Sequence, residues 1–427
     1  MAEELNVIGN GAPAKPVEKK SFWATILIFL SLIGPGLITG NFGNDAGGIT
    51  TYSVCGADFG LGMIWMVLPV TVILLLYQEM SGRLGAVTGK GLSDLIRENF
   101  GIRIAFYLMI GKFLAGIANT TAEFGGIAAS MELFGVNKYI SVPLMAILVW
   151  LLTIKANYRK LEKIFFIGIA FFACYIVAGL LSPIDWHEVA KQALTPSFRM
   201  DSQYLMLLVA LIGTTIAPWM VFYHQSAVVE KGISIAEFRY FRWELPFVGI
   251  SVGVVIFFII VTCSPLYSQG IRIETAQQAA MALVPLAGVY AKDLFAIGLL
   301  IASLGAAMIL PISTAFSVCE IFGWESGVNK KFMEAPQFYG MFTIQIILGA
   351  AIILIPGIPL IQVMILSQTI NGLLLPFVLV IMLILINKKK LMGEYANGPI
   401  VNFVAVAATI AITASVVILI YSSVFGS

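Results

Sequence analysis

Long apolar stretches alternate with short polar ones along almost the whole of this 427-residue chain. Eleven of the apolar stretches hold about 20 residues each, which is the length that an α-helix needs to cross the hydrocarbon core of a bilayer. Their centres lie at about residues 32, 70, 118, 147, 172, 216, 254, 305, 346, 374 and 412. The pattern therefore predicts an all-α polytopic membrane protein with eleven transmembrane helices.

Two of the predicted helices are interrupted by residues that favour neither a helix nor lipid. The first contains NFGNDAGGIT at residues 41–50, where glycine, asparagine and one carboxylate replace apolar side chains. The sixth contains GTTIAPW at residues 213–219, where Pro218 removes a backbone donor and clashes with the preceding turn. Each break falls in the first helix of a group of five. Paired interruptions of this kind indicate a transporter built from two inverted repeats of five helices, here with one extra helix.

The breaks are also the place where a substrate could bind. Unwound backbone is tolerated at membrane depth where it faces protein or a wet cavity, so helices 1 and 6 are predicted to unwind at the midplane. Backbone carbonyls near Phe42 and Thr214 could then act as ligands. Asp45 is the one carboxylate expected at either break, and an ionisable group inside a membrane indicates a functional site. Gly and Pro also produce simple kinks in membrane helices, which is the alternative for each break taken alone.

Composition supports the membrane assignment and excludes several classes of function. Hydrophobic residues make up 59% of the chain and charged residues 11%, whereas about a quarter of the residues in a soluble domain are charged. The net charge is +2 without a basic tract, so we expect no nucleic-acid partner. The four cysteines are widely spaced and only two histidines occur, which indicates neither a disulfide framework nor a structural metal site nor an enzyme. No cofactor is expected.

The distribution of Lys and Arg predicts the orientation in the membrane. If the N-terminus is cytoplasmic, the outer loops hold five of the 25 basic residues, namely Lys138, Lys191, Arg199, Arg272 and Lys292. The others, apart from Lys112, fall in inner segments, which places the C-terminus outside and favours the cell membrane. Lys112 lies within the third helix and is expected to extend to an interface.

Three parts are expected along the chain. Residues 1–20 are polar and lack the apolar core and cleavage site of a signal peptide, so they are expected to form a cytoplasmic tail. Residues 21–386 would form the transporter core, with repeats at about 22–183 and 203–386. Residues 387–427 would hold a cytoplasmic loop and the eleventh helix. The protein is expected to be a monomer.

Several motifs resemble the Nramp family of divalent-metal transporters. They are GPGLITG followed by DAGG, the stretch YQEMSGRLGAVTGKGLSDLIRENFG from Tyr77, TTAEFGG in the third helix, and LSQ with NGLLLPF around Gln368. The resemblance extends from about residue 25 to residue 390. It implies a leucine-transporter-like fold of two inverted five-helix repeats plus one or two further helices. It also implies a divalent metal ion as the substrate.

One departure from the family pattern removes an amide ligand. The first break of the family normally reads Asp-Pro-Gly-Asn, and here it reads Asp45, Ala46, Gly47 and Gly48. The aspartate is kept, whereas Gly48 replaces the asparagine that coordinates the metal. The resemblance therefore assigns Asp45 to the ion, and Ala46, Gly47 and Gly48 to the shape of the site.

A second departure removes a soft ligand. The sixth helix of the family reads Met-Pro-His, and here it reads Ala217, Pro218 and Trp219. A thioether favours transition metals over the hard Mg²⁺ ion, which keeps several waters and is usually held by one or two carboxylates. The combination resembles the prokaryotic Nramp-related magnesium transporters and predicts transport of partly hydrated Mg²⁺ and of Mn²⁺. The expected ligands are Asp45, Gln368 and the backbone carbonyls of Phe42 and Thr214. Close helix packing is the alternative reason for the small residues.

The proton route of the family is only partly present. Glu123 matches a family glutamate in the third helix, and His224 matches the second of two family histidines. Thr120 and Trp219 stand where many relatives have an acid and the first histidine, and tryptophan does not titrate. We therefore expect uncoupled transport, with Glu123 and His224 as structural remnants bonded to each other or to the backbone.

Two other functions stay open. One is an ordinary proton-coupled transition-metal transporter in which other residues replace the lost methionine. The other is an amino-acid or organic-cation carrier on the same scaffold, although Asp45 argues against an anionic substrate group at the break.

Overall fold

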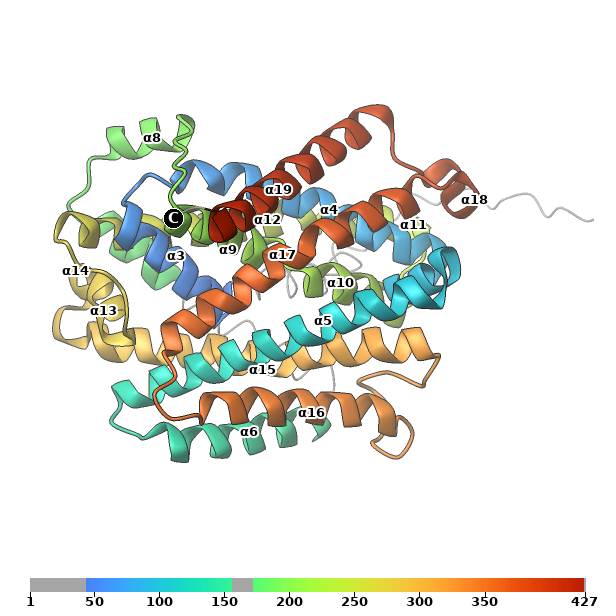
Figure 1. Cartoon of the computed structure of the whole chain (residues 1–427), viewed down its shortest axis with the longest axis horizontal. Coiled ribbons are helices and arrows are strands. Elements are labelled where there is room, and N and C mark those ends of the chain that lie inside the picture. The colour runs from blue at the N-terminus through green and yellow to red at the C-terminus, as the bar shows by residue number, and fades with distance from the viewer. Residues whose placement is uncertain (1–43, 156–171, 426–427) are drawn as a thin grey trace, which may run out of the picture.

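The computed structural model of the protein describes residues 44–155 and 172–425, and for residues 240 and 241 only the backbone. Every regular element in these ranges is a helix (Figure 1). Nine helical segments in them are long and apolar enough to cross a membrane, and a shorter apolar helix covers Phe172–Leu181. Nine predicted centres fall in those nine segments, and a tenth is the first residue of the short helix. The centre at residue 32 lies outside the described residues.

The membrane helices follow the predicted order. The first group contains α3 (Ala46–Phe59), α4 (Val67–Thr88), α5 (Leu92–Leu133), α6 (Lys138–Lys155) and the helix Phe172–Leu181. The second group contains α9 (Ser202–Thr215), α10 (Pro218–Glu230), α12 (Glu244–Ser268), α15 (Ala291–Phe322), α16 (Pro336–Ile353) and α17 (Leu360–Ile386). The last helix is α19 (Pro399–Phe425). Shorter helices in the connections include α8 (Trp186–Leu194), α11 (Ile235–Phe241), α13 (Ala276–Ala280), α14 (Val284–Ala287) and α18 (Lys389–Met392).

The length of α5 exceeds what a bilayer requires. Its 42 residues would span about 60 Å as one straight helix, about twice the thickness of the hydrocarbon core. Gly101 interrupts it with φ +83° and ψ 164°, a conformation that residues with a Cβ rarely adopt. A short helix therefore precedes the membrane helix proper and places its own N-terminus against α15.

Helices with the same place in the two groups of five pack against each other. The third members, α5 and α15, lie side by side through the middle of the molecule, and the fourth members, α6 and α16, lie together at one edge (Figure 1). Helix α17 packs on both α5 and α9, and α3 packs on α12, α9 and α17. Helix α19 covers α9 and α17 from outside. The start of α3 is thereby enclosed by helices of both groups.

Candidate metal-ion site

The first break ends where Asp45 starts helix α3. Asp45 is the N-cap residue, with extended backbone angles, and its Oδ1 accepts a hydrogen bond from the N–H of Gly48 at 2.7 Å. The carboxylate therefore lies at the positive end of the helix dipole, which favours a negative charge. The side chain is 2% exposed. A buried carboxylate held in this way is suited to receive a cation.

Gln368 on α17 faces this carboxylate. Its Nε2 donates to Oδ1 of Asp45 at 3.4 Å, and its Oε1 accepts a hydrogen bond from Asn371 at 3.0 Å. Asn371 in turn exchanges two hydrogen bonds with Asn119 of α5, at 2.8 and 3.0 Å. The two asparagines therefore fix the Gln368 amide with its nitrogen toward Asp45. Sequence reasoning did not identify this pair, because amides 252 positions apart carry no local signal.

Gly47 leaves the space that Gln368 occupies. A Cβ built on Gly47 would overlap with the Nε2, Cδ and Cγ atoms of Gln368, and Gly47 lies within the regular helix α3. The glycine is therefore required by close approach and not by an unusual backbone conformation. It places the amide of α17 directly on the first turn of α3.

We expect Gly47→Ala to lower the rate of metal uptake about tenfold or more while the protein still folds. The added methyl group would push Gln368 away from Asp45, and overpacking of this kind costs about 1–3 kcal/mol, which a protein of this size can tolerate. Metal uptake by reconstituted protein, together with thermal unfolding, measures both effects. The matched control is Gly111→Ala on α5, where a Cβ would meet only the end of the Leu374 side chain at 3.1 Å. Equal uptake by Gly47→Ala and the unmodified protein would contradict the placement of Gln368 in the site.

The second break separates α9 from α10. Helix α9 ends at Thr215, Ile216 and Ala217 leave the helical conformation, and Pro218 is the first residue of α10. Pro218 has no N–H, so it cannot bond to the carbonyl of Thr214 four residues earlier, as a continuous helix would require. The break lies close to the first one, because the Tyr52 hydroxyl of α3 contacts Oγ1 of Thr215 at 2.9 Å.

Helices α9 and α17 also approach closely. A Cβ on Gly213 would overlap with the backbone carbonyl oxygen of Gln368. The structure therefore brings Asp45, Gln368 and the last turn of α9, which contains Thr214, together. Phe42 lies outside the described residues.

The residues expected to shape the site are all buried beside it. A Cβ on Gly126 of α5 would meet the Cβ of Ala46, so α3 and α5 are in close contact there. Ala217 is 1% exposed and adopts an extended conformation before α10. The backbone carbonyl of Trp219 accepts a hydrogen bond from the Ser313 hydroxyl at 3.0 Å.

Glu123 lies closer to the first break than expected. Its Oε2 accepts a hydrogen bond from the N–H of Ala46 at 3.3 Å, so its carboxyl group lies beside that of Asp45. The expectation that Asp45 is the one carboxylate at either break is therefore wrong. A sequence does not show which side of the third helix meets the first, and this is why the proximity was missed.

The other residues of the family proton route contact different helices. Thr120 donates to the Gly116 carbonyl at 2.8 Å and contacts Oε1 of Gln345 at 3.4 Å, on the side of α5 that faces α16. His224 is buried on α10 against α4, where a Cβ on Gly82 would lie 2.9 Å from its Nε2.

Asn44 is a further buried polar residue that sequence reasoning did not select. It precedes Asp45 and is 1% exposed, and neither polar atom of its side chain has a hydrogen-bond partner within the described ranges. An unsatisfied buried amide costs free energy, so such a group indicates a place for a ligand or water. The signal available in the sequence was its position within the polar run of the first break.

The expectation that Lys112 extends to a membrane interface is also wrong. Its side chain is 2% exposed, because it points from α5 into the packed middle of the helix bundle. Nζ donates a hydrogen bond to the Ser313 carbonyl of α15 at 3.1 Å.

The donors around the break are mostly oxygen atoms. In the part of the chain that the structure describes, no three His, Cys, Asp or Glu side chains come together as a metal-binding cluster. A cation at this place would meet carboxylate and backbone carbonyl oxygens, which are ligands of hard divalent ions, and the Gln368 amide would have to rotate to add its oxygen.

Comparison with known proteins finds one matching family model and related metal transporters. A family model described as natural resistance-associated macrophage protein-like (Nramp) matches residues 36–422. The divalent metal cation transporter MntH of Burkholderia ambifaria is 27% identical over 407 residues, which cover 91% of this chain and 88% of that protein.

Two solved structures show the fold. A manganese transporter of Eremococcus coleocola has a TM-score of 0.74 at 21% identity and covers 95% of this chain and 89% of its own. MhsT in complex with L-phenylalanine has a TM-score of 0.56 at 13% identity, covering 91% of this chain and 98% of its own. These matches confirm the predicted leucine-transporter-like architecture.

Proposed function

The chain belongs to the Nramp family, and on that premise we propose that it imports Mg²⁺, and also Mn²⁺, by alternating access. Membership indicates a multi-pass transporter and not an enzyme. The matched relatives support a divalent metal ion as the substrate, because one is named a divalent metal cation transporter and another a manganese transporter.

We assign Mg²⁺ as a substrate because residue 217 provides no thioether ligand. Ala217 stands at the break between α9 and α10, where the family's metal-binding methionine is expected, and its methyl group cannot ligate a metal. The proposed ligands are Asp45, Gln368, and the backbone carbonyls of Thr214 and Phe42, which are all oxygen donors. An ion at Asp45 would replace its hydrogen bond with Gln368, and rotation of that amide would turn Oε1 toward the ion.

Small side chains support binding of a partly hydrated ion. Gly48 and Ala217 are buried at the two breaks, and because they are smaller than the asparagine and methionine of the family pattern, they would leave room for water molecules that a larger ligand would displace. Mg²⁺ usually keeps several of its waters in protein sites. Asn44, with its buried amide, is a further group that could bind such a water.

The proposal also includes movement of the metal without protons. Neither Thr120 nor Trp219 titrates near physiological pH, so the chain of titratable groups that would include Glu123 and His224 is interrupted. The membrane potential and the concentration gradient would then drive uptake. One observation favours a second candidate, a proton-coupled Mn²⁺ or Fe²⁺ transporter. The carboxyl group of Glu123 lies beside Asp45 and could exchange a proton when a metal binds.

The topology belongs to the same proposal. We place the two inverted repeats at about residues 22–183 and 203–386, after a tail of about 20 residues. The N-terminus would be cytoplasmic and the C-terminus outside, and a monomer would suffice for transport.

Reconstituted vesicles test the proposed function directly. Protein in liposomes that contain a pH-sensitive dye receives Mn²⁺ outside, alone or with Mg²⁺, Ca²⁺ or Cd²⁺, and both metal uptake and internal pH are recorded. We expect Mg²⁺ to inhibit Mn²⁺ uptake and to enter the vesicles itself, because both ions would use the oxygen ligands at Asp45. Internal pH should stay constant while metal uptake generates a current. Vesicles without protein provide the control.

Two results would separate the candidates. Failure of Mg²⁺ to inhibit Mn²⁺ uptake at any concentration would exclude the magnesium assignment. Acidification that scales with the amount of metal taken up would establish the proton-coupled mechanism instead.

A further inference from the structure

Lys112 is a buried basic residue to which the proposed transport function assigns no role. Its Nζ bonds to the Ser313 carbonyl and lies 5.0 Å from the centre of the Phe222 ring on α10. In residues 44–155 and 172–425 no carboxylate lies within salt-bridge distance of it, although the carboxyl group of Glu320 on α15 is near enough to act on it electrostatically. A carbonyl oxygen and the face of an aromatic ring both stabilise an ammonium group. An ionisable side chain held so deep in a membrane helix indicates a function.

Polar groups connect Lys112 with the ion site. Lys112 lines a small enclosed cavity directly beyond the second break, together with Asn119, Pro218, Trp219, Thr314 and Asn371. Asn119 and Asn371 form the amide pair that holds Gln368, and Gln368 contacts Asp45. Two layers of amide side chains therefore separate the ammonium group from the carboxylate.

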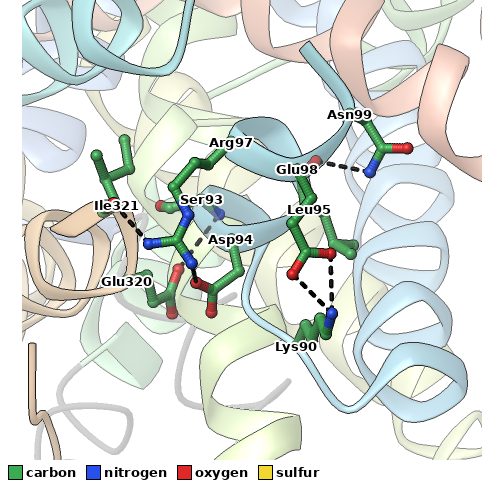
Figure 2. A network of polar contacts seen from close by, with 9 residues as sticks. All are labelled: Lys90, Ser93, Asp94, Leu95, Arg97, Glu98, Asn99, Glu320 and Ile321. Atoms are coloured by element: carbon green, nitrogen blue, oxygen red, sulfur yellow. Dashed lines mark hydrogen bonds and ion pairs between the residues drawn. The ribbon is translucent and has the colours of Figure 1, made fainter. Parts of the chain in front are cut away.

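A second polar network lies at the N-terminal end of α5, on the far side of Lys112 from the ion site. At the start of α5, the Glu320 carboxylate of α15 accepts the N–H of Ser93 at 3.2 Å, and Arg97 donates to the Ile321 carbonyl at 2.7 Å (Figure 2). Glu320 also accepts a hydrogen bond from Ser226 of α10. These contacts tie α5, α10 and α15 together, and Lys112 lies between them and the ion site along α5. The predicted orientation makes this end cytoplasmic.

We propose that Lys112, in its protonated form, places a positive charge on the inner half of the ion route, and that this charge speeds release of the divalent ion toward the cytoplasm. The inference rests on the proposed function of the Asp45 site. Asp45 and Glu123 attract a divalent cation, and a cation bound too tightly leaves slowly. A single positive charge across the amide pair lowers this affinity, because repulsion between a divalent and a monovalent cation is strong in a medium of low dielectric constant. Lys112 thereby lowers the affinity of the site for the ion and raises the rate of its release.

Two neutral variants, Lys112→Met and Lys112→Gln, test the proposal, and Lys112→Arg keeps the charge. Affinity is measured with Mn²⁺ alone on the purified full-length protein by calorimetry, and uptake kinetics are measured in vesicles. We expect both neutral variants to bind Mn²⁺ about three- to tenfold more tightly, with a lower KM and a lower maximal rate of uptake. Lys112→Arg should behave as the unmodified protein does. A purely structural role would lower the amount of folded protein without tightening Mn²⁺ binding.

Lys138 provides a matched control. Its Nζ also bonds to backbone carbonyls, those of Ile353 and Ile355, and lies 5.5 Å from the ring centre of Tyr139, but it does so away from the ion site. Lys138→Met should therefore change neither affinity nor rate. Unchanged or weaker Mn²⁺ binding by the folded Lys112→Met and Lys112→Gln variants would overturn the proposal. If the unmodified protein bound no Mn²⁺, the proposed function itself would fail, and that result is distinct.

Discussion

Replacing Asp45 by alanine should abolish divalent-metal uptake while most of the protein still folds. The carboxylate is the charged group that α3 itself supplies to the site. The neighbouring amide and carbonyl groups carry no charge, and the Glu123 carboxyl group already accepts the N–H of Ala46. Loss of the N-cap hydrogen bond to Gly48 costs about 1 kcal/mol, which is small beside the packing of the helix bundle. Uptake in vesicles and thermal unfolding of the purified protein measure the two effects separately.

Two further variants separate the charge of Asp45 from its role as a cap. Asn caps a helix about as well as Asp, so Asp45→Asn should keep the unfolding temperature and still lose transport. Asp201 caps α9 through the N–H of Tyr204 at 2.8 Å. Asp201→Ala should therefore show a comparable loss of stability with transport intact. Mg²⁺ uptake that persists in folded Asp45→Asn would place the ion site elsewhere, with Glu123 as the next carboxylate to test.

The helices and their breaks were predictable because they follow from short-range chemistry. Bilayer thickness sets the length of an apolar segment, and Pro218 interrupts the sixth helix whatever packs around it. The same is true of Asp45, which is a residue type that caps helices at the start of a new one. The kink at Gly101 was not predicted, because it lies in the charged stretch RENFGIR before the apolar part of the third helix, and only the backbone angles show that two helical segments meet there.

The surroundings of the ion site could not be predicted, because they depend on which faces of distant helices meet. Glu123 and Lys112 lie on the same helix, α5, and both are buried, but one contacts α3 and the other contacts α15. Residue spacing along α5 does not determine these partners. The close approach of Gly47 and Gln368 likewise cannot be predicted from the sequence. Taken alone, the first is a glycine in a helix and the second is a polar residue in a membrane helix.

Restoring the soft ligand should reverse the metal preference. In the double variant Ala217→Met with Gly48→Asn, a thioether and an amide would reach the ion from the two breaks, as the family pattern has them. Thioether sulfur binds Cd²⁺ and Mn²⁺ in preference to Mg²⁺, and the added side chains take the space of bound waters. We expect the ratio of Mg²⁺ to Cd²⁺ uptake to fall about tenfold or more, which corresponds to about 1.4 kcal/mol between the two ions.

The control for this prediction keeps the volume and removes the sulfur. Ala217 is 1% exposed, so any larger side chain there will strain its neighbours, and overpacking costs about 1–3 kcal/mol. Ala217→Leu with Gly48→Asn introduces a side chain of similar size to methionine that cannot ligate a metal. It should lower the uptake of all metals without raising that of Cd²⁺ relative to Mg²⁺. If the leucine and methionine variants changed selectivity equally, the size of the cavity and not the softness of the ligand would determine which ion is carried.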